Sequence, residues 1–313
     1  MVATERRSPR VVIAGGTGAI GSNLTTALLA QGFEVVILSR NPSARSDRAE
    51  EVSWDARSAN GWARNLEGAV AVVNFVGKSL DCRHTPANKQ AILDSRLDSV
   101  NALRQAINSV DRGPDAWIQV SGVGYYGDAG DALCTEDAPK GEGFVADVVD
   151  TCENAFYESV RPETRAVALR LGIVLGGGAA GLEKLASLAR WGLGGTVGSG
   201  RQYMSWVHMD DVVRAFIWSI QNDAIRGTYN VCTPNPETNA DFMRALRAAV
   251  KAPWSPPVPA PLVRLGAAVI GTQPDLALDG QRAASDRIRD TGFTFRYPDL
   301  PTALENALRS DSK

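Results

Sequence analysis

Short apolar runs rich in β-branched residues alternate along much of the chain with longer segments in which apolar residues recur every three or four positions. The short runs are typical of strands buried on both faces, and the longer spacing is typical of helices. The predicted strands are 10–14, 34–38, 51–54, 70–75, 116–121, 165–171 and 228–231. The predicted helices are 19–31, 86–107, 144–160, 182–191 and 210–221. This alternation predicts an α/β fold of the Rossmann type, with a doubly wound parallel sheet.

The pattern changes after Leu175. Glycines punctuate the chain from 176 to 200, and from Thr233 onward prolines lie between short apolar segments that are typical of short helices. These features predict a smaller, mixed C-terminal lobe built beside the sheet. We therefore expect a Rossmann domain formed by 8–176 and 205–232, and a smaller substrate lobe formed by 177–204 and 233–313.

Composition narrows the classes of function. A net charge of −2 and a sequence pI of about 5.8 give no basic field for nucleic acid or an anionic membrane. No apolar run approaches the roughly 20 residues that span a bilayer, and no apolar stretch of a secretory signal follows the two N-terminal arginines. Four scattered cysteines and two histidines predict neither a disulfide framework nor a metal site. We expect a cytoplasmic protein.

The strongest motif is the glycine-rich segment 14–21 (AGGTGAIG), which lies between a predicted strand and a predicted helix. In such a loop Gly15 permits a tight turn, Gly18 lets the backbone approach a pyrophosphate, and Gly21 allows close packing of helix and strand. The amide groups of the first helical turn then face the phosphates. The expected cofactor contacts in this loop are Gly15, Thr17, Gly18, Ala19, Ile20 and Gly21.

The end of the second strand indicates which dinucleotide is bound. An NAD-binding protein usually carries Asp or Glu here, whereas this chain has Ser39 and Arg40. A hydroxyl and a guanidinium are donors suited to a 2′-phosphate, although Arg40 could also be an exposed residue that begins a loop. Asp55, after the third strand, either meets the adenine or caps a short helix. The segment 76–78 (VGK) follows the fourth strand at the expected cofactor crevice.

These motifs resemble the extended short-chain dehydrogenase/reductase superfamily. The same resemblance extends to 121–128 (SGVGYYGD), 170–176 (RLGIVLG) and 206–211 (WVHMDD). More narrowly, the chain is similar to the atypical "epimerase family protein" branch, whose bacterial members are labelled sugar-nucleotide epimerases. The closer match is carried by 94–96 (DSR), 124–127 (GYYG), 192–195 (GLGG), 198–200 (GSG) and the tail 291–300 (TGFTFRYPDL), and it covers nearly the whole chain. The tail is similar to a C-terminal domain of unknown function that is typical of the branch.

The resemblance implies NADP(H) as the cofactor, with contacts at Ser39, Arg40, Asp55 and Val76 to Lys78. The branch usually has Glu at the last of these positions, so Lys78 reverses a charge. It could add a contact to phosphate or remove one to ribose.

Proton transfer is the point at which the chain departs from the superfamily. Its reductases use a Ser or Thr with a Tyr-x-x-x-Lys pair, in which the lysine lowers the pKa of the tyrosine phenol. If Glu153 is the acidic residue that usually follows this lysine by four positions, the pair falls on Val145 and Val149, which cannot move a proton. Ser121 could still orient a carbonyl oxygen, and Tyr125 could act as a replacement acid.

Other polar residues have structural alternatives. Tyr126 aligns with a structural Tyr-Gly of the superfamily, and the match of His208 to a structural histidine favours a hinge role over acid–base chemistry. The glycines from 192 to 200, followed by Arg201, Gln202 and Tyr203, are typical of a pocket for a polar small molecule.

Two classes of function remain open. One is an NADP(H)-dependent oxidoreductase or epimerase that acts on a small carbonyl or sugar-nucleotide substrate. The other is a non-catalytic NADP(H)-binding protein that senses redox state or stabilises a partner. The chain could be a monomer or a homodimer, because the valines of 144–160 suit either a four-helix interface with 86–107 of both copies or packing within one chain.

Overall fold

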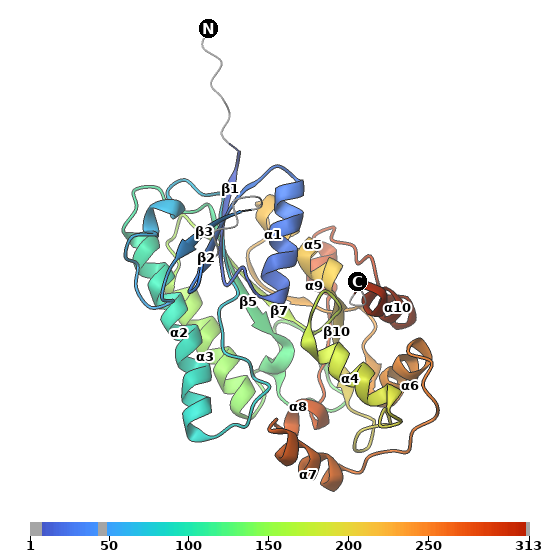
Figure 1. The fold of residues 1–313 in the computed structure, drawn as a ribbon. Helices are drawn as coiled ribbons and strands as arrows, with labels where there is room; N and C mark the ends of the chain where they lie inside the picture. Colours follow the sequence, from blue (N-terminus) through green and yellow to red (C-terminus); the bar gives the residue numbers. More distant parts are fainter. Residues whose placement is uncertain (1–7, 43–48, 311–313) are drawn as a thin grey trace.

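A seven-stranded parallel sheet forms the centre of the computed structural model, which describes residues 8–42 and 49–310 (Figure 1). Its strand order is β11–β7–β5–β4–β1–β2–β3. The strands are β1 (Arg10–Ala14), β2 (Glu34–Ser39), β3 (Glu50–Ser53), β4 (Ala71–Asn74), β5 (Ala116–Gly122), β7 (Arg165–Leu171) and β11 (Gly227–Val231). The order runs outward in one direction from β1 to β3 and in the other from β4 to β11. This confirms the doubly wound sheet, with its reversal between β1 and β4.

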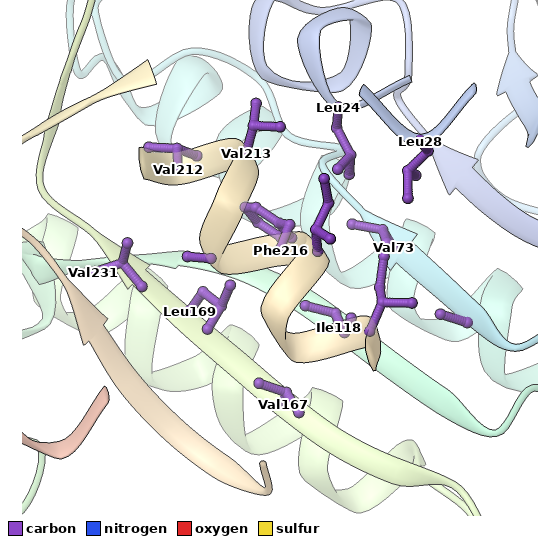
Figure 2. Packing of buried hydrophobic residues seen from close by; sticks show 14 of the residues in the cluster. Leu24, Leu28, Val73, Ile118, Val167, Leu169, Val212, Val213, Phe216 and Val231 are labelled. Carbon is purple, nitrogen blue, oxygen red and sulfur yellow. The ribbon is translucent and has the colours of Figure 1, made fainter. Parts of the chain in front are cut away.

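Both faces of the sheet are covered by helices, which explains the near-continuous apolar strands. Within β1, Val11 and Ile13 pack into the core on one face, and Val12 and Ala14 pack into the core on the other. The first face is covered by α1 (Ala19–Ala30) and α5 (Met209–Gln221), and Phe216 of α5 lies in one buried cluster with Leu24 of α1, Val73 of β4 and Ile118 of β5 (Figure 2). The second face is covered by α2 (Pro86–Asn108) and α3 (Phe144–Ser159) (Figure 1).

Local signals fix where these helices begin and end. Thr85 caps α2 by accepting a hydrogen bond from the Asn88 amide, and Pro86 occupies the first turn, where its missing N–H is not needed. Helix α1 ends at Ala30. Gly32, two residues later, has a φ of +83°, and the chain turns there directly into β2.

The remaining elements lie beyond β7, together with one short strand before α3. Three two-stranded sheets join β8 (Ile173–Leu175) to β10 (Trp206–His208), β9 (Tyr203–Met204) to β12 (Glu237–Thr238), and β6 (Leu133–Cys134) to β13 (Arg282–Ala283). The further helices are α4 (Ala180–Arg190), α6 (Asn239–Ala249), α7 (Ala260–Ile270), α8 (Asp275–Leu278), α9 (Asp286–Asp290) and α10 (Leu300–Ser310). Two short 3₁₀ helices, η1 (Ala63–Leu66) and η2 (Val123–Tyr126), complete the chain.

A separate apolar core lies in this C-terminal region. It is built from α4, α6 and α10 and includes Leu182, Phe242, Leu246 and Leu304. Trp206 of β10 also belongs to it, so the short β8–β10 sheet connects this core with the Rossmann sheet.

All seven predicted strands enter the sheet, and the predicted helices form with shifts of one or two residues at their ends. The structure starts β3 at Glu50 rather than 51, starts α4 at Ala180 rather than 182, and ends α1 at Ala30 rather than 31. The prediction that no secretory signal is present falls mostly on residues 1–7, which lie outside the described residues. Within 8–42 and 49–310, no helix is long and apolar enough to cross a membrane.

The two helices considered for a dimer interface pack on each other within the chain. Ile92 of α2 and Val148 and Cys152 of α3 form one buried cluster. Packing within one chain therefore accounts for Val148, while Val145 and Val149 remain half-buried.

Candidate functional site

The glycine loop after β1 has the backbone shape that its three glycines predict. Gly15 has a φ of +77°, a conformation that side chains disfavour. A Cβ on Gly21 would lie 2.6 Å from Gly16 Cα and 2.8 Å from the Gly15 carbonyl oxygen, so α1 packs directly on the loop. Gly18 differs from both, because its φ is −74° and its Cβ would meet only the Gly15 oxygen, at 3.6 Å. Nothing in the described part of the chain requires glycine at position 18.

Gly18 is also the N-cap of α1. No side chain caps this helix, and its first turn contains no acidic residue. The first helical hydrogen bond runs from the Ser22 amide to the Gly18 carbonyl, so the amides of Ala19, Ile20 and Gly21 are those that a helix leaves without an internal acceptor. Thr17 and Gly18 are exposed beside them. An anion bound here would meet these free amides and would also lie at the positive end of the helix dipole.

The loop after β4 lies against the glycine loop. A Cβ on Gly15 would be 3.3 Å from the backbone and side chain of Val76. Buried Asn74 shapes this loop: its Oδ1 accepts from the Val76 amide, and its Nδ2 donates to Ser99 and Gln119. Lys78 donates from Nζ to Asn88 Oδ1, and its amide donates to Ser95 Oγ. The Lys78 ammonium is thus held by α2.

The end of β2 lies on the other side of the glycine loop, whose Gly15 amide donates to the Leu38 carbonyl. Ser39 is buried, and its Oγ accepts from the Asn41 amide at 3.3 Å; within 8–42 and 49–310 its hydroxyl donates to no acceptor. Arg40 is exposed. The loops after β1, β2 and β4 therefore meet at the carboxyl edge of the sheet, at its topological reversal.

Asp55 lies just beyond β3 and accepts hydrogen bonds from the residues that follow it. Its Oδ1 accepts from the amides of Arg57 and Ser58, each at 2.8 Å. These hydrogen bonds lower the pKa of the exposed Asp55 carboxyl. Asp55 therefore closes a turn and caps no helix, because the next helix begins only at Ala63, with Trp62 as its N-cap. A cofactor contact at Asp55 stays a prediction.

The helix face that would carry the Tyr-x-x-x-Lys pair is apolar. Val145 packs beside η2, because a Cβ on Gly124 would lie 2.7 Å from Val145 Cγ1. Both Val145 and Val149 are half-buried on α3. Ser121, at the end of β5, donates its hydroxyl to Glu153 Oε1 at 2.5 Å. In this arrangement the Ser121 proton is directed at Glu153 rather than toward a ligand.

Glu153 belongs to a buried polar network that the sequence did not reveal. It forms a two-pronged ion pair with Arg170, whose Nε and Nη2 lie 2.9 and 2.6 Å from the two carboxylate oxygens. Arg170 Nη1 donates to the Tyr126 hydroxyl, which donates in turn to Asn230 Oδ1. Burial raises the pKa of Tyr126 to about 12. Tyr126 thus keeps its proton and has the structural role that the sequence predicted.

Tyr125 lies on the same arginine. The Arg170 guanidinium carbon is 3.5 Å from the centre of the Tyr125 ring, which is a cation–π contact. Tyr125 is half-buried, so part of it remains accessible. The structure places Ser121, Tyr125 and Val145 around η2 and the end of β5, and their catalytic role stays a prediction.

His208 caps α5 and is buried. Its Nδ1 accepts from the Asp210 amide at 3.1 Å, and its ring packs on Tyr297 with centroids 4.0 Å apart. Burial lowers the pKa of the imidazole. This geometry connects β10 and α5 to the C-terminal tail, which agrees with a structural role for His208.

The glycine-rich segment that ends before Arg201 lies against the C-terminal region. Gln202 donates from Nε2 to the carbonyls of Val197 and Ala277, and the Arg282 guanidinium carbon lies 5.0 Å from the Tyr203 ring centre. Arg201 pairs with Asp131 across 3.7 Å. The polar residues predicted to line a pocket thus gather where β6, β9 and β13 meet. Among the described residues, no group of three or more His, Cys, Asp or Glu side chains could hold a metal ion.

Comparisons with known proteins agree with this architecture. Residues 11–232 match the family model described as the NAD dependent epimerase/dehydratase family, and residues 258–307 match a domain of unknown function, DUF1731. The chain is 33% identical to the mouse epimerase family protein SDR39U1 over 96% of this chain and 99% of that one.

Two solved structures resemble the whole chain. Human epimerase family protein SDR39U1, crystallised with NADPH, is 32% identical with a TM-score of 0.86, covering 97% of this chain and 100% of the human one. A nucleoside-diphosphate sugar epimerase from Corynebacterium glutamicum is 29% identical with a TM-score of 0.77, covering 96% of this chain and 58% of that one.

Proposed function

The chain belongs to the NAD dependent epimerase/dehydratase family, and we propose that it binds NADP(H) and transfers hydride to or from a small carbonyl or sugar-nucleotide substrate. One observation carries the cofactor part of the proposal. Gly18 is the only glycine of the 15, 18 and 21 set that the fold does not require, and it lies at an uncapped helix start. A ligand that approaches the backbone there explains why no side chain is present.

The residues at the carboxyl edge of the sheet suit NADP(H) part by part. The amides at the start of α1 would hold the pyrophosphate, and Ser39 and Arg40 would hold the 2′-phosphate. Asp55 would lie at the adenosine end, and Val76 to Lys78 would border the other half of the dinucleotide. The human relative that was crystallised with NADPH supports this choice over NAD(H). When bound, the nicotinamide ring supplies or accepts the hydride.

The chain's own residues limit the proton chemistry. Because Val145 and Val149 cannot ionise, hydride transfer has to proceed without a tyrosine–lysine relay. Ser121 could orient a carbonyl oxygen only if its hydroxyl turns away from Glu153. Tyr125 is the remaining phenol near the end of β5, and its ring is held by Arg170. Turnover of a simple carbonyl should therefore be slow, or confined to a substrate that brings its own acid.

The same geometry supports a second candidate function. A serine that donates to Glu153 and a Tyr126 whose pKa is raised to about 12 leave a site that binds a dinucleotide without evident proton transfer. Such a protein would act as an NADP(H)-dependent sensor or would stabilise a partner.

Two measurements separate these functions. The first follows the absorbance of NADPH while the protein is mixed with a panel of carbonyl compounds and nucleoside-diphosphate sugars. Substrate-specific consumption that is lost in Ser121→Ala or Tyr125→Phe establishes an enzyme. The second measurement compares proteins captured by the NADPH-loaded and the cofactor-free chain.

The double variant Val145→Tyr/Val149→Lys serves as an internal control for the panel. If neither the natural chain nor this variant consumes NADPH with any compound, while a partner is captured only by the loaded form, the binding function holds. If the natural chain does not bind NADPH at all, both proposals fail.

A further inference from the structure

Arg96 lies beside the cofactor loop, although the site described above does not use it. It belongs to the 94–96 segment of α2. A Cβ on Gly77 would lie 2.9 Å from the guanidinium carbon of Arg96, so the glycine leaves the space that this side chain fills. Arg96 Nη1 donates to the carbonyls of Lys78 and Ile92, at 3.0 and 2.9 Å. The guanidinium is thereby fixed between the β4 loop and its own helix.

The charge of Arg96 has no counterion within the part of the chain that the structure describes. Its Nε and Nη2 donate to no acceptor among the described residues. Its electrostatic neighbour Cys152 is not a counterion, because burial raises the pKa of that thiol to about 11 and keeps it neutral. Burial lowers the pKa of Arg96, which shows that the surroundings disfavour its charge. Nε and Nη2 are not among the buried polar atoms that lack a partner, so they remain open to solvent, where the acceptors of a bound ligand can replace water.

The position of Arg96 indicates which part of the cofactor would supply these acceptors. Ser39, Arg40 and Asp55 follow β2 and β3, on one side of the sheet reversal. A dinucleotide whose pyrophosphate lies on α1 and whose adenosine lies over that side must place its nicotinamide half over β4 and β5. The loop of Gly77 follows β4.

Arg96 also faces the helix that lacks the lysine. Cys152, its electrostatic neighbour, is on α3 and follows Val149 by less than one turn. Ile92, one turn before Arg96 on α2, packs with Val148 and Cys152 of α3, so Arg96 lies about one turn from the α2–α3 contact that neighbours Val149.

We propose that Arg96 binds the nicotinamide half of NADP(H) and supplies the positive charge that Val149 cannot. The free Nε and Nη2 donors match the hydroxyl oxygens of the nicotinamide ribose. An arginine keeps its protons at neutral pH, so it fixes the cofactor and adds positive charge but does not relay a proton. The inference rests on the proposed binding of NADP(H) and adds a residue that the glycine motif does not contain.

The test is a calorimetric titration of the full chain with two ligands. NADPH contains both halves of the cofactor, and adenosine 2′,5′-bisphosphate contains only the adenosine half with its 2′-phosphate. Arg96→Met should weaken NADPH binding by about ten- to a hundredfold, as expected for loss of hydrogen bonds from a charged group. Binding of adenosine 2′,5′-bisphosphate should change by less than about twofold, and this ligand also reports that the variant is folded.

Three control variants distinguish a direct contact of Arg96 with the cofactor from an indirect effect on the loop or on the surface charge. Arg104→Met removes an exposed arginine from the same helix and should leave both affinities unchanged. Ser95→Ala removes another anchor of the β4 loop, the hydrogen bond from the Lys78 amide, and should change NADPH binding little. Arg96→Lys should retain more NADPH affinity than Arg96→Met, because it keeps the charge.

The proposal is overturned if Arg96→Met binds NADPH as the natural chain does, or if it loses both ligands equally. It is also overturned if Ser95→Ala reproduces the loss, because the loss would then come from a loosened loop. If the natural chain binds neither ligand, the proposed function itself has failed, and the two failures are thus distinguishable.

Discussion

Substitution of Gly18 should separate folding from cofactor binding. In Gly18→Val the new side chain starts from a φ of −74° and a ψ of 169°, an extended conformation that valine adopts readily. Its Cβ meets only one atom, at 3.6 Å. A less suitable N-cap residue destabilises, while loss of a flexible glycine from the unfolded chain stabilises. The two effects oppose each other, so stability should change by about 1 kcal/mol or less.

The effect on binding should be much larger. The valine side chain occupies the space through which a pyrophosphate reaches the amides at the start of α1. We expect NADPH affinity to fall at least about a hundredfold, which corresponds to about 2.7 kcal/mol. NADH should be lost equally, because both dinucleotides share the pyrophosphate.

The matched control is Gly21→Ala. Its Cβ would lie 2.6 Å from Gly16 Cα, so α1 has to move and stability should fall by about 3 kcal/mol. Chemical denaturation measures both stabilities, and calorimetry measures both affinities. If Gly18→Val retains NADPH at near-natural affinity, or unfolds as readily as Gly21→Ala, the assignment of the loop is wrong.

Three further predictions test other parts of the structure. Arg40→Ala should weaken NADPH binding about ten- to a hundredfold and leave NADH binding unchanged, whereas equal losses in titration would show that Arg40 does not contact the 2′-phosphate. Glu153→Gln leaves the buried Arg170 charge unpaired and should lower the free energy of unfolding by about 3 kcal/mol. The double variant with Arg170→Met should recover part of the lost free energy. A denaturant titration that shows no loss for Glu153→Gln would contradict the role of the pair. Burial lowers the native pKa of His208 below its ordinary 6.5, so its contribution to stability is present above pH 6.5 and is lost as the pH falls further. His208→Asn, which can keep the cap on Asp210, should make the free energy of unfolding depend less on pH between about pH 7 and 5. An unchanged pH dependence would show that other groups cause the loss.

The sequence determined the sheet, its helices and the cofactor loop because their signals are local. Strand β1 is apolar at every position from Val11 to Ala14 since both faces are covered, and the glycines follow it at the spacing that is typical of a dinucleotide loop. The valines at 145 and 149 could likewise be found by counting back from Glu153 along one helix, and their replacement of a Tyr–Lys pair stays a prediction. In each case the residues that decide the structure are neighbours in the chain.

The tertiary structure alone decided which polar groups meet. Glu153 lies on helix α3 and Arg170 on strand β7, and nothing in their spacing shows that they form a buried ion pair. Nor does it show that Glu153 accepts a hydrogen bond from the Ser121 hydroxyl. Arg96 stands in the middle of a helix, where an arginine is usually solvated. Only the packing of α2 against the Gly77 loop shows that its charge is partly buried and that its Nε and Nη2 donate to no acceptor among the described residues. Charges and hydrogen bonds act through space over a few ångströms, so their partners are set by the fold rather than by position in the chain.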